Sequence, residues 1–183
     1  KTVYTVKFMA DEQEYETKRI TNLDVTISRP STNPTKNGYE FDKWTYGDKT
    51  WDFGKSVAEN LRENPITDSI SLTATWTANV YRITYELNGG TNHHDNPKEY
   101  RYGMGVSELF APTRDGYTFD GWYKDASFTG DTITAISDTE EGDITLYAKW
   151  TQRYHSTISD GTLTRSDGSK LADENGSVTA KAR

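Results

Sequence analysis

The sequence predicts a mostly β protein of the α+β class, made of two tandem copies of one small module and a polar C-terminal tail. Three observations predict this fold: an internal repeat, alternating apolar and polar residues within the repeated segments, and little helical periodicity. The modules are expected at residues 1–77 and 79–151, and the tail at residues 152–183.

The repeat consists of three segments that recur in the same order. They are VYTVKF at residues 3–8 and VYRITY at 80–85, NPTKNGYEFDKW at 33–44 and APTRDGYTFDGW at 111–122, and SLTATWT at 71–77 and TLYAKWT at 145–151. The spacing between partners differs by only a few residues, so insertions and deletions are expected in loops.

The first and last segments of each module have the pattern of half-buried strands. In the first module Tyr4, Val6 and Phe8 alternate with polar residues, and Leu72 and Trp76 share a face of the closing segment. Second strands are expected at residues 15–20 and 99–102, and these strands supply most of the predicted sheet.

The middle segment is a turn that leads into an aromatic strand. Pro34 fixes φ and Gly38 permits a positive φ, as do their counterparts in the second copy. Strict alternation places Trp44 on the face opposite Phe41. Either a β-bulge turns the tryptophan inward, or the strand is covered on both faces.

One short helix is expected, at residues 55–63. Val57, Ala58 and Leu61 fall on one helical face, and Ser56 can cap the N-terminus. The corresponding segment, residues 132–137, is rich in β-branched residues and is not expected to be helical.

Composition excludes several classes of function. The chain has no cysteine, so disulfides, thiolate zinc sites and cysteine nucleophiles are absent. The net charge of −7 disfavours nucleic acid and anionic membranes as partners, and no apolar stretch is long enough for membrane insertion.

Catalytic, cofactor and metal sites are not expected. The chain has no nucleophile-elbow motif, no phosphate-binding glycine loop and no calcium-loop spacing among its acidic residues. His93, His94 and Asp95 are adjacent, but neighbouring histidines in a strand point to opposite faces. This group is therefore predicted to be a solvated loop tip, and the protein a non-enzyme.

The aromatic residues can form either the core or a sugar-stacking surface. Few other large apolar residues are available, so the core is predicted to take the rings of the aromatic strands. These are Tyr39, Phe41, Trp44, Tyr117, Phe119 and Trp122. Tyr46, Trp51 and Tyr123 lie beyond the shared motif, and these three are the candidate ligand-binding residues.

The motif P-T-[KR]-[ND]-G-Y-x-F-x-x-W, followed by a closing L-x-A-x-W, resembles the Listeria and Bacteroides repeat family, best known from the B repeats of internalin-type surface proteins. The resemblance covers about residues 1–151. It implies a β-grasp-like fold with a four-stranded sheet packed on a short helix or loop. It also implies an extracellular place, on a bacterial cell surface or secreted, and no catalytic activity.

The expected function is that of a semi-rigid spacer or presentation module, with other domains of the same surface protein as partners. The short junction at residues 77–79 favours this role. The alternative is a module that binds a glycan or a host protein through exposed aromatic rings.

In the tail, Asp160 and Gly161 predict a hairpin, which either begins another module or packs on the second repeat. The remainder of the tail is predicted to be flexible from its composition.

Overall fold

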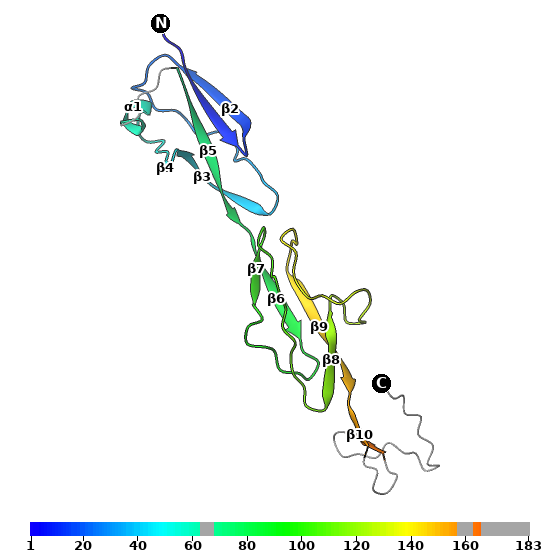
Figure 1. Cartoon of the computed structure of the whole chain (residues 1–183). Helices are drawn as coiled ribbons and strands as arrows, with labels where there is room; N and C mark the ends of the chain where they lie inside the picture. The colour runs from blue at the N-terminus through cyan, green and yellow to red at the C-terminus, as the bar shows by residue number, and fades with distance from the viewer. Residues whose placement is uncertain (63–67, 157–162, 166–183) are drawn as a thin grey trace. The chain divides into compact units, whose positions relative to one another are not determined.

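The computed structural model describes residues 1–62, 68–156 and 163–165 of the chain (Figure 1). The fold is mostly β, as predicted, and the chain divides into two compact units, Lys1–Asn79 and Val80–Arg183. Among the described residues, no helix combines the length and apolar character needed to span a bilayer.

The first unit contains one mixed sheet with the strand order β2-β1-β5-β3-β4. Its strands are β1 (Tyr4–Ala10), β2 (Gln13–Ile20), β3 (Tyr39–Tyr46), β4 (Lys49–Thr50) and β5 (Ser69–Ala78). The expected four-stranded sheet is therefore extended by the two-residue strand β4, which pairs with the end of β3.

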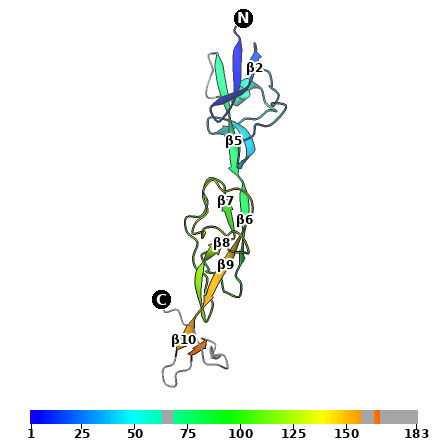
Figure 2. The same cartoon turned by 90° about the vertical axis from the view of Figure 1, so that its right-hand side faces the viewer.

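The second unit repeats this arrangement with the order β7-β6-β9-β8 (Figure 1), and Figure 2 shows the same strands after a rotation by 90°. Its strands are β6 (Val80–Glu86), β7 (Glu99–Arg101), β8 (Tyr117–Tyr123) and β9 (Ile144–Gln152). Each strand occupies the position of its sequence counterpart in the first sheet, so the repeated segments fold alike.

The first and last long strands of each unit lie side by side and run parallel. β1 pairs with β5 from Thr5 opposite Ser69 to Met9 opposite Thr73, and β6 pairs with β9 in the same way. A chain that begins and ends on parallel neighbours enters the sheet at one end and leaves it at the other. Each unit is therefore traversed from end to end.

A β-bulge in β3 and another in β8 place the motif tryptophans in the cores. Phe41 pairs with Trp76 and Lys43 with Thr75, so Asp42 is the extra residue. The same irregularity follows Phe119 in β8. The bulge reverses the alternation, so Trp44 is only 2% exposed and Trp122 only 1%. The structure thus selects the bulge from the two predicted alternatives.

Each unit has its own core, centred on its bulge tryptophan. Phe8 meets Trp44 edge-on with ring centroids 5.0 Å apart, and Tyr85 meets Trp122 in the corresponding position at 5.2 Å. The Tyr85 hydroxyl donates a hydrogen bond to the Pro97 carbonyl, and burial raises the pKa of Tyr85 to about 12. Tyr85 therefore takes the position that Phe8 has in the first unit, and its hydroxyl keeps a hydrogen-bond partner.

The other rings predicted for the core lie nearer the surface. Phe41 and Phe119 are half-buried and pack against the core clusters. Tyr39 and Tyr117 are half-buried outside those clusters, which corrects their assignment to the core. Each lies under a basic group: the Lys36 Nζ is 4.7 Å from the Tyr39 ring, and Arg114 Cζ is 3.6 Å from the Tyr117 ring.

The predicted helix is present but short, as α1 (Val57–Asn60). Ser56 is its N-cap, as expected, and forms a capping box with Glu59. Val57 and Leu61 are buried in the first core. The counterpart segment, residues 132–137, lacks a helix, in agreement with the prediction; there Ile133 donates a backbone hydrogen bond to Trp122.

In the tail, β10 (Tyr154–Ser156) pairs antiparallel with β11 (Leu163–Arg165). The predicted turn at Asp160 and Gly161 lies between these strands but outside the described residues. The prediction of flexibility for residues 166–183 also falls outside them.

Replacing Trp122 by alanine should unfold the second unit and spare the first. Truncation of a buried tryptophan costs about 3–5 kcal/mol, which is comparable to the stability of a small module. Amide NMR spectra of Trp122→Ala should lose dispersion only for residues 80–152. The control Met104→Ala, at a side chain 75% exposed, should leave both units folded. Loss of the first unit's signals in Trp122→Ala would contradict the independence of the two cores.

Candidate functional site

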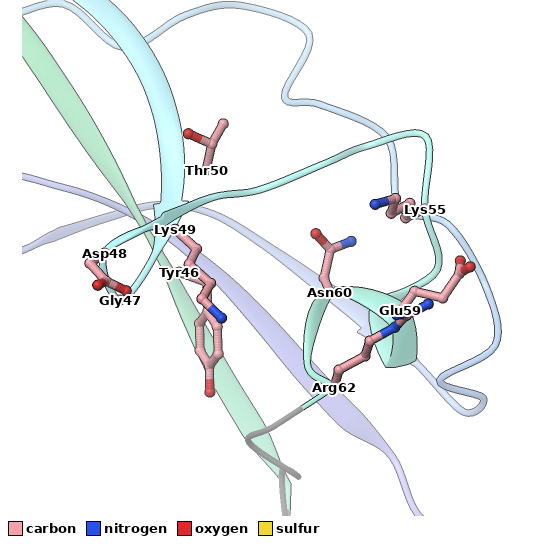
Figure 3. A pocket seen from close by; sticks show the side chains of 9 residues that line it. All are labelled: Tyr46, Gly47, Asp48, Lys49, Thr50, Lys55, Glu59, Asn60 and Arg62. Atoms are coloured by element: carbon pink, nitrogen blue, oxygen red, sulfur yellow. The ribbon is translucent and has the colours of Figure 1, made fainter.

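A polar pocket of about 510 Å³ lies between the β3–β4 turn and helix α1 (Figure 3). One wall comes from the turn and the other from α1 and its flanks. The lining residues are Tyr46, Gly47, Asp48, Lys49, Thr50, Lys55, Glu59, Asn60 and Arg62.

The helical wall is fixed by side-chain hydrogen bonds to the backbone. The Asp52 N–H donates to Asn60 Oδ1 at 2.9 Å, and Asn60 Nδ2 donates to the Asp52 carbonyl at 2.9 Å. The Ser56 N–H donates to Glu59 Oε2 at 2.8 Å, and the Glu59 N–H donates to Ser56 Oγ at 3.1 Å. This wall is held in place before any ligand arrives.

The charges lining the pocket are mixed, with a small cationic excess. Lys49, Lys55 and Arg62 face a space that Asp48 and Glu59 also line. Hydrogen bonds from the Ser56 backbone and hydroxyl hold the pKa of Glu59 below its ordinary value. The pocket therefore presents hydrogen-bonding groups and an aromatic ring, which suits polar ligand binding rather than catalysis.

Tyr46, one of the three candidate ligand residues, lines this pocket and is half-buried. Trp51, the second candidate, is only 3% exposed and belongs to the first core, so it does not present its ring to a ligand at the surface. The tight β3–β4 turn reverses the chain, so the backbone N–H of Trp51 donates to the backbone carbonyl of Trp44. The Trp51 ring lies in the core and meets the Tyr46 ring edge-on, with the two ring centroids 6.3 Å apart.

Tyr123, the third candidate, belongs to the second unit. It is half-buried in β8, with Phe128 edge-on at 5.6 Å and the Lys149 Nζ at 5.6 Å. Tyr46 and Tyr123 therefore do not form one platform within a single module. Their roles in ligand binding stay predictions.

The loop between β6 and β7 contains His93, His94 and Asp95. The last two side chains are exposed, as predicted for a solvated loop tip, and that of His93 is half-buried. The side chains of His94 and Asp95 are 85% and 57% exposed, and that of His93 is 32% exposed. The segment is a loop, as predicted, so the alternation that separates neighbouring side chains in a strand does not apply to it. The rings stack with centroids 4.5 Å apart, and the donor atoms of all three residues lie within 4.8 Å of one another.

Comparison with known proteins agrees with the repeat. The model of the Listeria-Bacteroides repeat domain matches residues 4–62 and 81–149. The chain is 37% identical over 157 residues to Internalin H of Listeria monocytogenes, covering 81% of this chain and 25% of that protein.

It is also 33% identical over 153 residues to a protein of Evansella cellulosilytica whose name describes it as a Gly-rich membrane protein. That match covers 81% of this chain and 16% of the relative. A second membrane protein by name, from the same organism, is 34% identical over 152 residues, with 81% of this chain and 21% of the relative covered. The chain thus spans a quarter or less of the length of these relatives.

Removal of the capping carboxylate should weaken the first unit most at neutral pH. A carboxyl group with a lowered pKa in the folded state contributes stability above its unfolded pKa. That contribution is lost as the pH falls below about 4.5 and through the lower folded pKa. We expect the stability difference between wild type and Glu59→Gln, measured by urea unfolding, to shrink on acidification. A difference that grows on acidification would refute this role.

Two further variants distinguish the effect of the helix cap on stability from that of the other charges in the pocket. Ser56→Ala removes the N-cap hydroxyl and should cost about 1 kcal/mol. Asp48→Asn removes a carboxylate from the opposite wall, outside the capping box, and should cost less at pH 7.

Proposed function

The chain belongs to the Listeria-Bacteroides repeat domain family, and on this premise we propose that it is a non-catalytic, semi-rigid spacer in a bacterial surface protein. In this role the modules extend and present other domains of the same polypeptide outside the cell. Three relatives support a surface location: Internalin H and the two Evansella cellulosilytica proteins whose names describe them as membrane proteins.

The observation that carries the proposal is the parallel pairing of the first and last long strands in each unit. A module entered and left at opposite ends adds its own length to the polypeptide. Closing strand β5 has 10 residues, which corresponds to roughly 33 Å at about 3.3 Å per residue. A fold whose termini emerged at the same end would add far less.

The junction supports limited bending between modules. β5 ends at Ala78 and β6 begins at Val80, so Asn79 alone separates the strands. The Asn79 N–H donates to the Gly38 carbonyl at 2.9 Å, within the first unit. In the second unit, the Arg153 N–H donates to the Gly116 carbonyl at 2.8 Å. The residue after each closing strand is thus tied to the turn of its own module, which leaves few free dihedral angles.

Lengthening the junction should make the pair of modules flexible. The chain contains no native cysteine, so Val3→Cys and Met104→Cys give two unique labelling sites at side chains 50% and 75% exposed. Single-molecule energy transfer between dyes should give a narrow distance distribution. Insertion of Gly-Ser-Gly-Ser after Asn79 should broaden it. Equal widths in the two proteins would contradict the semi-rigid spacer.

The pocket beside Tyr46 favours a second candidate function, the binding of a glycan or a host protein. A sugar can place its apolar face on the Tyr46 ring, and its hydroxyl or carboxylate groups can reach the Lys55 and Arg62 side chains. The cationic excess of the lining suits an acidic sugar better than a neutral one.

A glycan array distinguishes this function from a pure spacer. If the pocket binds a sugar, Tyr46→Ala and Arg62→Ala should each weaken binding at least tenfold, because each removes one contact group. Tyr123→Ala, the matched substitution in the second unit, should leave binding unchanged. Circular dichroism should confirm that each variant is folded. Absence of binding at millimolar sugar, or equal binding by Tyr46→Ala, would exclude this pocket as a glycan site.

A further inference from the structure

We propose that His93, His94 and Asp95 form a surface site for one divalent transition-metal ion of the zinc, nickel and copper group. This proposal is independent of the spacer and glycan functions, because it rests on a different unit and different side chains. Two imidazoles and one carboxylate are a ligand set that these ions accept.

The positions of the donor atoms carry the proposal. His94 Nε2 lies 3.4 Å from Asp95 Oδ1, and His93 Nδ1 lies 3.9 Å from Asp95 Oδ2. In a tetrahedral zinc site with bonds near 2.1 Å, neighbouring ligand atoms are about 3.4 Å apart. The two histidine–carboxylate distances are therefore close to the spacing that such a site requires, and all three ligand atoms lie within 4.8 Å of one another.

The orientation of the His93 ring also suits a ligand. The Asp95 N–H donates to His93 Nδ1 at 3.1 Å. Because a backbone amide can only donate, this nitrogen carries a lone pair directed toward Asp95, which is the form that binds a metal. An ion at this position would take the place of the amide as the partner of that lone pair.

The loop is ordered by groups behind the three ligands. Asn96 is 8% exposed; its side chain donates to the Phe110 carbonyl at 2.8 Å and accepts from the Phe110 N–H at 2.7 Å. Asn92 Oδ1 accepts from the His93 N–H and from Asn96 Nδ2. The Phe110 ring stacks on His93 with centroids 4.7 Å apart. These contacts hold the loop backbone and the His93 ring in place before an ion binds, and preorganisation of this kind favours binding.

Residues 1–62 and 68–79, the described part of the first unit, contain no equivalent of this site. There, β1 and β2 are joined by the two residues Asp11 and Glu12, whereas β6 and β7 are joined by residues 87–98. The longer connection is not required by the shared fold, since the first sheet forms without it. Extended ordered loops are common places for binding sites. The geometry thus assigns the metal ion to the second copy alone.

Isothermal titration of the whole chain with zinc chloride, and then with nickel chloride, tests the proposal. We expect one ion per chain. His94→Ala and Asp95→Asn each remove one ligand from an exposed position, and each should weaken binding at least tenfold. Loss of a supporting group alone costs roughly 10- to 100-fold in metal affinity.

His155→Ala is the matched control, because it removes the third histidine of the chain from β10, outside the cluster. It should retain wild-type affinity and stoichiometry. Absence of saturable binding by the wild-type chain would overturn the proposal, as would unchanged affinity in both His94→Ala and Asp95→Asn. A stoichiometry of one ion per two chains would also overturn it, since the site would then require a second copy.

Discussion

The structure of each module depends on a tryptophan that a β-bulge carries into the core. Without the bulges that follow Phe41 and Phe119, Trp44 and Trp122 would face away from the residues they now cover. Each tryptophan contacts the ring of the opening strand, Phe8 or Tyr85, and the ring that precedes it in its own strand. The preceding ring in turn meets the tryptophan of the closing strand, as Phe41 meets Trp76 and Phe119 meets Trp150, so these aromatic contacts join the opening, middle and closing strands into one unit.

The same contact explains why the two copies share the spacing of the motif although the rest of their sequences differs. The bulge requires an extra residue between the phenylalanine and the tryptophan, and the parallel pair requires the opening and closing strands to run in one direction. Asp42 and Asp120 are the extra residues, half-exposed or exposed, so they need only be compatible with the bend. The bulge brings the tryptophan into the core, and the parallel pair places the two ends of each module on opposite sides. Both features are properties of the same three strands.

The sequence predicted the elements of the fold better than the exposure of individual rings. Alternation and turn residues identified the strands, and a capping serine located the helix, because these signals are local. The burial of Trp51 could not be predicted from the sequence, because it depends on the two-residue turn between β3 and β4, which directs a residue beyond the shared strand back to the core. The stacking of His93 on His94 could not be predicted for a related reason: the shape of this loop is set by the hydrogen bonds of Asn96 with Phe110, a residue 14 positions further along the chain.

Both candidate sites lie where the two copies differ. The pocket uses α1, which the second unit replaces by a segment bridged to β8, and the metal cluster uses a connection that the first unit reduces to a two-residue turn. The shared strands cannot easily supply such sites, because their large side chains are needed for the core. Connections at the surface are free of that requirement and can change length at little cost in stability. A repeat array of this kind can thus keep one spacing unit constant while individual copies acquire separate binding properties.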